Sequence, residues 1–215
     1  MSAHLTEEQQ LEALKEWWKE YGWSIVLGVV IAISVGFGWR FYQRYETQKT
    51  NHASLIYMHV MADAAEGNVQ GARRQANVLR NHFARTPYAV LASFLLAQEA
   101  VQKNKLDDAV EYLQWAADHA HVATFKDMAK IRLARIYLAQ HQPKKALALL
   151  DTRKDDAFAG LMAEVQGDVY VEMQDLTKAR ASYVLALKKL SEDAVTRHLL
   201  EMKLNDLSLP DGASS

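Results

Sequence analysis

The sequence predicts an all-α protein, with one apolar helix near the N-terminus that crosses a membrane and a body made of repeated helix pairs. Three observations support this fold class. The 215 residues include three Pro and nine Gly, so a fold rich in strands and tight turns is not expected. An uncharged run of 19 residues follows an acidic N-terminal segment. Beyond that run, one pattern of small and apolar residues recurs at a nearly constant interval.

Composition and charge exclude several classes of function. Lys and Arg total 25 against 26 for Asp and Glu, so the net charge of -1 supplies no general attraction to nucleic acid. The chain has no Cys, which excludes disulfides, thiolate nucleophiles and Cys-containing zinc sites. We therefore expect neither a nucleic-acid partner nor redox chemistry.

The uncharged run, Tyr21–Trp39, is long enough for a membrane-spanning helix. At about 1.5 Å per residue, it nearly covers a hydrocarbon core of about 30 Å. Aromatic side chains, which favour the headgroup level, stand at both ends: Trp17, Trp18, Tyr21 and Trp23 before it, and Phe37, Trp39, Phe41, Tyr42 and Tyr45 after it. A cleaved signal peptide and a buried core helix are the alternatives, but the acidic flank and the missing A-x-A site disfavour cleavage. We predict a retained transmembrane helix.

The charges that flank this helix leave its orientation open. Lys15 and Lys19 precede the run, whereas Arg40, Arg44 and Lys49 follow it. Positively charged flanks favour the cytoplasm, so the bias favours a cytoplasmic body by a single charge. A difference this small does not decide the topology.

Small residues recur along the membrane helix at every fourth position. They are Ser24, Gly28, Ala32 and Gly36. On a helix they form a packing seam that lets a second helix approach closely inside the bilayer. We hypothesise that a partner helix docks there; the alternative is that small residues are simply common in membrane helices.

The rest of the chain consists of a repeated pattern. Its copies start at Ala53, Val90, Asp127 and Gly160, so successive starts are 37, 37 and 33 residues apart. The twentieth place of every copy is Ala: Ala72, Ala109, Ala146 and Ala179. The tetratricopeptide pattern requires a small residue there because the paired helices approach closely. The first copy fits least well and is expected to be a degenerate or capping pair.

These observations divide the chain into five segments. Residues 1–20 form an N-terminal segment, 21–42 the transmembrane helix and 43–52 a helical stalk. Residues 53–209 form a tetratricopeptide-like helical-repeat solenoid of about four helix pairs and a C-terminal capping helix, and 210–215 form a disordered tail. The capping helix is expected from about Ala194 to Asp206, where Val195, Leu199 and Met202 share one face that would close the end of the solenoid, with His198 as an optional member of that face.

One face of the first helices is a candidate partner-binding groove. In each copy it takes the second, fifth, ninth and twelfth places, which fall together at about 100° per residue. Its members are Leu91, Phe94, Gln98, Val101, Met128, Ile131, Arg135, Leu138, Leu161, Glu164, Asp168 and Val171. This largely apolar face suits a segment of another chain with apolar side chains. The alternative is that these residues pack on neighbouring helices.

Motifs for chemistry are missing from the sequence. It has no G-x-S-x-G elbow, phosphate-binding Gly loop or H-E-x-x-H helix. His119 and His121 are two residues apart and point to different faces of a helix. The basic residues Lys126, Lys130, Arg132 and Arg135 are typical of a solvated helix face. We expect no enzyme activity and no catalytic, cofactor-binding or metal site.

Four short motifs stand in order along the chain: GWRFY at 38–42, ASLIY at 53–57, IRLAR at 131–135 and MKLNDL at 202–207. Together with the acid-flanked helix, they resemble the ancillary SecYEG translocon subunit family, also called YfgM, from about Gln10 to Leu209. The resemblance implies a single-pass protein of the Gram-negative inner membrane, with residues 1–20 in the cytoplasm and the repeats in the periplasm. It also implies partners, namely the SecYEG translocon and the periplasmic chaperone PpiD, and a family without catalytic residues.

We therefore expect a membrane-tethered protein-binding module that assists periplasmic chaperones with newly exported, unfolded polypeptides. Its tether raises the effective concentration of the binding face near the channel. The alternative is a structural adaptor that links inner-membrane complexes without binding client polypeptides.

Overall fold

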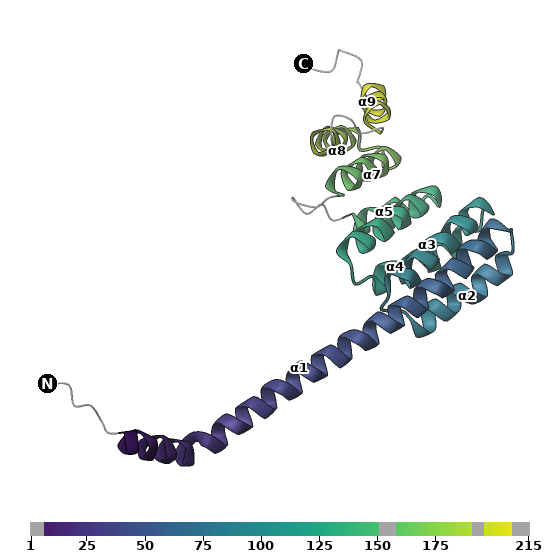
Figure 1. Ribbon diagram of the computed structural model, residues 1–215. Coiled ribbons are helices and arrows are strands. Elements are labelled where there is room, and N and C mark those ends of the chain that lie inside the picture. Colours follow the sequence, from purple (N-terminus) through teal and green to yellow (C-terminus); the bar gives the residue numbers. More distant parts are fainter. Residues whose placement is uncertain (1–6, 151–157, 191–195, 208–215) are drawn as a thin grey trace, which may run out of the picture. The chain divides into compact units, whose positions relative to one another are not determined.

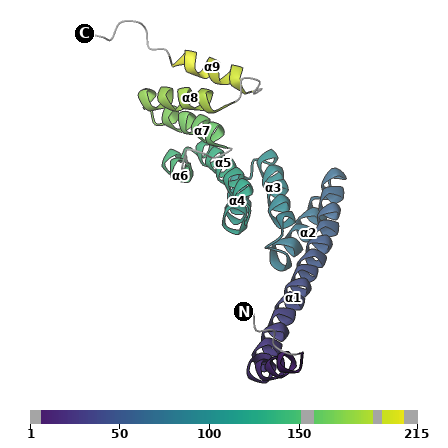
Figure 2. The ribbon, with the colours of Figure 1, turned by 60° about the vertical axis from the view of Figure 1, so that its left-hand side comes forward.

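A computed structural model describes residues 7–150, 158–190 and 196–207 of the chain. Every regular element in those ranges is an α-helix, which confirms the predicted all-α class (Figures 1 and 2). The chain divides into two compact units, Met1–Asn51 and His52–Ser215. The tail expected at 210–215 and the first six residues of the N-terminal segment lie outside the described residues.

The first unit is formed by most of α1 (Glu7–Ala65). From Trp17 onward this helix is long and apolar enough to cross a membrane, with a mean hydropathy of 1.9 in its most apolar window. The large apolar side chains that the structure describes between Trp17 and Tyr45 are exposed, such as Trp23 at 79% and Phe41 at 76%. Hydrocarbon is the solvent that such a surface favours. The helix is unbroken over 43–52, where neither Gly nor Pro interrupts it.

The second unit is a stack of helix pairs. The end of α1 pairs with α2 (Val69–His82), α3 (Pro87–Gln102) with α4 (Leu106–His119), α5 (Ala123–Ala139) with α6 (Pro143–Leu149), and α7 (Ala159–Glu172) with α8 (Leu176–Lys189); α9 (Arg197–Asp206) follows. The Ala at the twentieth place of each copy is at most 3% exposed. The small residues therefore lie where paired helices meet, as the tetratricopeptide-like pattern predicts.

The turn inside each pair has one backbone geometry. The residue at the fifteenth place of each repeat copy lies in this turn and has a positive φ: 74° at Gly67, 55° at Asn104, 56° at His141 and 59° at Gln174. The next residue donates its N–H to a carbonyl five residues back, as in Lys105 N to Ala100 O at 2.8 Å. This is the Schellman arrangement that ends a helix. The left-handed residue thus has the same 37, 37 and 33 spacing as the repeats, although only the first copy uses Gly.

Helix α9 packs through a different face from the one expected. Leu200 is fully buried against Tyr183, with Leu204 and Leu207 beside it. Leu199 and Met202 are about half exposed, at 49% and 48%. The expected face was therefore wrong, because the residues that contact the preceding pair are spaced at 200, 204 and 207. His198 is exposed too, and Ala194 and Val195 lie outside the described residues.

Candidate partner-binding site

A pocket of about 380 Å³, the α3–α5 pocket, lies between the first helices of two successive pairs. Its lining residues are Phe94, Ala97, Gln98, Val101 and Gln102 from α3, Leu113 from α4, and Arg132, Arg135 and Ile136 from α5. Its floor is apolar because Phe94, Leu113 and Ile136 reach it from three helices. None of the nine described residues that line it is acidic.

Aromatic contacts hold one wall of the α3–α5 pocket. The Arg132 guanidinium carbon lies 4.5 Å from the centre of the Phe94 ring, a cation–π geometry that favours this position of the cation. The Phe94 ring meets that of Phe125 edge to face at 6.5 Å. Burial, followed by the like charge of Arg135, lowers the pKa of Arg132. The guanidinium remains charged at neutral pH, so the pocket carries two positive charges.

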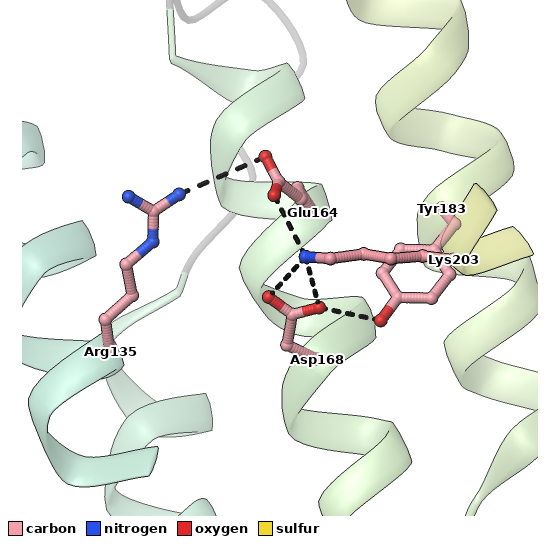
Figure 3. Close-up of polar contacts among 5 residues, drawn as sticks. All are labelled: Arg135, Glu164, Asp168, Tyr183 and Lys203. Atoms are coloured by element: carbon pink, nitrogen blue, oxygen red, sulfur yellow. Dashed lines mark hydrogen bonds and ion pairs between the residues drawn. The ribbon is translucent and has the colours of Figure 1, made fainter. Parts of the chain in front are cut away.

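Arg135 connects the α3–α5 pocket to a cluster of charged residues. This Lys203 cluster consists of Arg135, Glu164, Asp168, Tyr183 and Lys203 (Figure 3). The Lys203 ammonium lies 3.1 Å from Glu164 Oε1 and 2.8 and 3.0 Å from the two Asp168 oxygens. The Tyr183 O–H donates to Asp168 at 2.7 Å. Helix α9 is thereby joined to two carboxylates of α7, those of Glu164 and Asp168.

Burial decides the electrostatics of the Lys203 cluster. The Glu164 side chain is 6% exposed, and among the described residues its Oε2 accepts no hydrogen bond. That oxygen lies 4.0 Å from Arg135 Nη2, which is a loose ion pair. Burial lowers the pKa of Lys203, but its hydrogen bonds and charge interactions with Asp168 and Glu164 outweigh this and leave the pKa raised. Burial and the bond to Asp168 also raise the pKa of Tyr183.

The structure distributes the twelve expected groove residues over four environments. Phe94, Gln98, Val101 and Arg135 line the α3–α5 pocket. Glu164 and Asp168 belong to the Lys203 cluster rather than to an open rim. Val171 is partly exposed on α7, and the others are buried or half-buried in the hydrophobic clusters between helices: Leu91, Met128, Ile131, Leu138 and Leu161.

Several pocket residues were missed by the sequence analysis. Arg132 and Ile136 stand at the sixth and tenth places of their copy, each one residue beyond the expected groove positions. A fixed set of places misses them because α3 and α5 present different edges to the space between them. Arg132 is exposed, as expected for a solvated face, and its guanidinium also lies over the Phe94 ring. Its closeness in sequence to Arg135 was the available signal.

A second pocket of about 300 Å³ lies on the other flank of α3. Met61 of α1, Val69 of α2 and Leu95 of α3 line it with their neighbours. Gln98 and Gln102 line both pockets. The exposed edge of α3 therefore separates two hollows on the face formed by the first helices.

The membrane seam has open space around it. Gly28, Ala32 and Gly36 are exposed on α1. Apart from the adjacent residues and the nearby backbone of the helix itself, no described atom lies within 4 Å of a Cβ added at Gly28 or Gly36. The Ser24 side chain lies outside what the structure describes. A second helix has room to approach along this seam, which remains a prediction.

His119 and His121, the two closely spaced histidines of the sequence, lie in different surroundings. Among the side chains that the structure describes, no three His, Asp or Glu groups gather in a way that would hold a metal ion. His119 stacks on Trp115 with ring centres 4.3 Å apart, and its Nδ1 is 2.9 Å from the Trp115 carbonyl. His121 is exposed.

Comparison with known proteins gives concordant results. The model of the tetratricopeptide repeat-like domain family matches residues 15–209. Relatives named "Ancillary SecYEG translocon subunit" come from Escherichia coli K12 (29% identical over 212 residues), Neisseria gonorrhoeae (29% over 209) and Haemophilus influenzae (26% over 207). The alignments cover 96–97% of this chain and 100% of each relative. The resemblance drawn from the four sequence motifs is confirmed.

Proposed function

Because the chain belongs to the tetratricopeptide repeat-like domain family, we propose that it is a membrane-tethered protein-binding module of the SecYEG translocon. The α3–α5 pocket carries this proposal, since it is an apolar hollow on the face that helical solenoids commonly use for binding. The full-length similarity to proteins named as translocon subunits supports the choice of complex. The module acts by binding and performs no chemical step.

The proposed location is the bacterial inner membrane, with the N-terminus in the cytoplasm and the helix pairs in the periplasm. The exposed apolar surface of α1 supports insertion into a bilayer. Flanking charges differ by one between the two sides, which opposes this orientation only weakly. In the periplasm, the module would meet newly exported chains and the chaperone PpiD.

The proposed contact inside the membrane is the seam of Ser24, Gly28, Ala32 and Gly36. Small side chains allow close helix packing in lipid, and the seam is open at Gly28 and Gly36. Gly28→Leu with Gly36→Leu should therefore reduce co-purification with the translocon. The control is Val26→Leu with Val30→Leu on the opposite side of the helix. Equal co-purification by both double variants would count against the seam.

The proposed mechanism is tethering. A binding face fixed beside the channel meets emerging polypeptide at a high effective concentration, so a weak site suffices. Unfolded polypeptide offers the apolar side chains that the α3–α5 pocket accommodates. Client binding would assist chaperones by keeping such segments out of non-specific contacts.

Photocrosslinking in native membranes tests this function. A crosslinker at Gln98, which is exposed between the two pockets, should capture newly exported polypeptide during export. The control position is Arg180, which is exposed on α8, the second helix of its pair, and should give no such product. If Gln98 captures folded membrane subunits but no exported chains, the protein is a structural adaptor and the client-binding function fails.

A further inference from the structure

We propose that the α3–α5 pocket selects polypeptide segments in which a carboxylate stands next to an apolar side chain, and that Arg132 and Arg135 bind the carboxylate. The inference rests on the proposed protein-binding function and specifies its ligand. The occupant is therefore an acidic, apolar stretch of another chain.

The apolar half of the ligand follows from the pocket floor. Phe94, Leu113 and Ile136 are nearly buried, yet each lines the hollow. Val101 is 42% exposed at its edge. An apolar side chain that enters removes its own surface and that of Val101 from water, which is the favourable term in such binding.

The acidic half follows from two positive charges that the protein neutralises only in part. The ion pairs among the described residues do not include Arg132, which rests on the Phe94 ring instead. Arg135 has Glu164 as its ion-pair partner, at the long distance of 4.0 Å. The two arginines are three residues apart on α5, where like charges repel each other. A ligand carboxylate between them would relieve that repulsion.

Guanidinium groups suit this role for geometric reasons. Arginine presents a planar fork of donors that matches the two oxygens of a carboxylate. Because the described pocket lining has no acidic residue, no carboxylate of the lining competes with the ligand. Glu164, which does not line the pocket, contacts Arg135 through an ion pair of 4.0 Å to its buried Oε2. That oxygen accepts no hydrogen bond from Arg135. The donors of Arg135 thus remain available to a ligand, whereas a basic segment would be repelled.

Three synthetic peptides test the inference on the full-length protein in lipid nanodiscs. Leu alternates with Glu in the first fluorescent peptide, with Gln in the second and with Lys in the third. Fluorescence anisotropy should give affinities in the order Glu, Gln, Lys, with the Glu peptide about tenfold tighter than the Gln peptide, as expected for bonds to charged groups.

Variants of the two arginines locate the effect. Arg132→Gln or Arg135→Gln should remove most of the tenfold preference for Glu while leaving affinity for the Gln peptide nearly unchanged. Arg132→Glu should shift the preference toward the Lys peptide. Lys126→Gln is the matched control, since it removes a positive charge from α5 outside the pocket and should keep the preference. Arg132→Lys retains the positive charge without the planar fork of donors. Circular dichroism verifies that each variant is folded.

Three results would overturn the inference. Equal affinity for the Glu and Gln peptides would show that the pocket does not recognise a carboxylate. Polypeptide crosslinks from Gln98 would still support the protein-binding function in that case. If neither peptide binds and Arg132→Gln instead abolishes self-association, the occupant is a second copy of the chain. Loss of the Glu preference in Lys126→Gln would also contradict a role specific to the two arginines.

Discussion

Replacement of Lys203 by Met should release α9 from α7. The ammonium group lies within 3.1 Å of Glu164 and within 3.0 Å of both Asp168 oxygens. Methionine keeps an apolar stem of similar length but has no charge. The substitution therefore leaves two carboxylates one helical turn apart on α7 without the cation that binds both of them.

The size of the effect follows from burial. Removing one partner of a fully buried ion pair costs about 3–5 kcal/mol, because the remaining charge loses its compensation. The Lys203 and Asp168 side chains are 27% and 24% exposed, so water compensates part of the loss. We expect a cost of about 2 kcal/mol, scaled down from the buried range. In a stack of repeats this loss stays close to the altered interface.

Hydrogen exchange of the full-length protein measures the release directly. A loss of about 2 kcal/mol corresponds to about thirtyfold faster exchange of protected amides in α9. Exchange in α3 and α4 should stay the same. Met202→Ala is the matched control, since Met202 is the preceding residue, is half exposed and lies outside the cluster. Unchanged exchange of α9 in Lys203→Met would refute the reasoning, because the ion pairs would then contribute nothing to docking.

Three further predictions concern the same half of the protein. Gln174→Gly should stabilise it by about 1 kcal/mol in urea unfolding, since Gln174 has φ 59° and glycine adopts that conformation without a Cβ clash; a loss of stability would contradict the turn geometry. Gly167→Ala should destabilise it by about 1–3 kcal/mol in the same assay, because the new Cβ would overlap the Tyr183 ring; no loss would show that the ring moves freely. The pKa values of Lys203 and Tyr183 are raised on folding, so the contribution of these two groups to folding stability is complete below pH 10.0 and is lost as the pH rises through the raised values. If the helical circular dichroism signal of Lys203→Met resists alkali as well as that of the unaltered protein, this pH dependence is contradicted.

The repeat architecture could be predicted because it depends on local spacing. Ala72, Ala109, Ala146 and Ala179 recur at one place of each copy, and close packing of paired helices allows few residue types there. The apolar run in α1 was predictable for a similar reason, since a bilayer sets its length. Both patterns are visible without knowledge of distant contacts.

The pocket depends on which helix edges face each other, and spacing within one helix does not determine this. Arg132 lines the pocket because α5 presents the sixth place of the third repeat copy to Phe94 of α3. The sequence predicted that Glu164 and Asp168 form the rim of a groove. In the structure they bind Lys203, which is 35 or more residues away in sequence, and spacing within α7 does not reveal this contact. The left-handed turn residue was hidden because Asn104, His141 and Gln174 replace the glycine of the first copy.

Hydrogen exchange of the full-length protein with and without a chemically unfolded secretory polypeptide tests the central claim most directly. If the first helices form the binding face, exchange should slow in α3 and α5 around Gln98 and Arg135, and α6 and α8, which line neither pocket, should be unaffected. Protection confined to the second helices, or none at saturating polypeptide, would contradict the account.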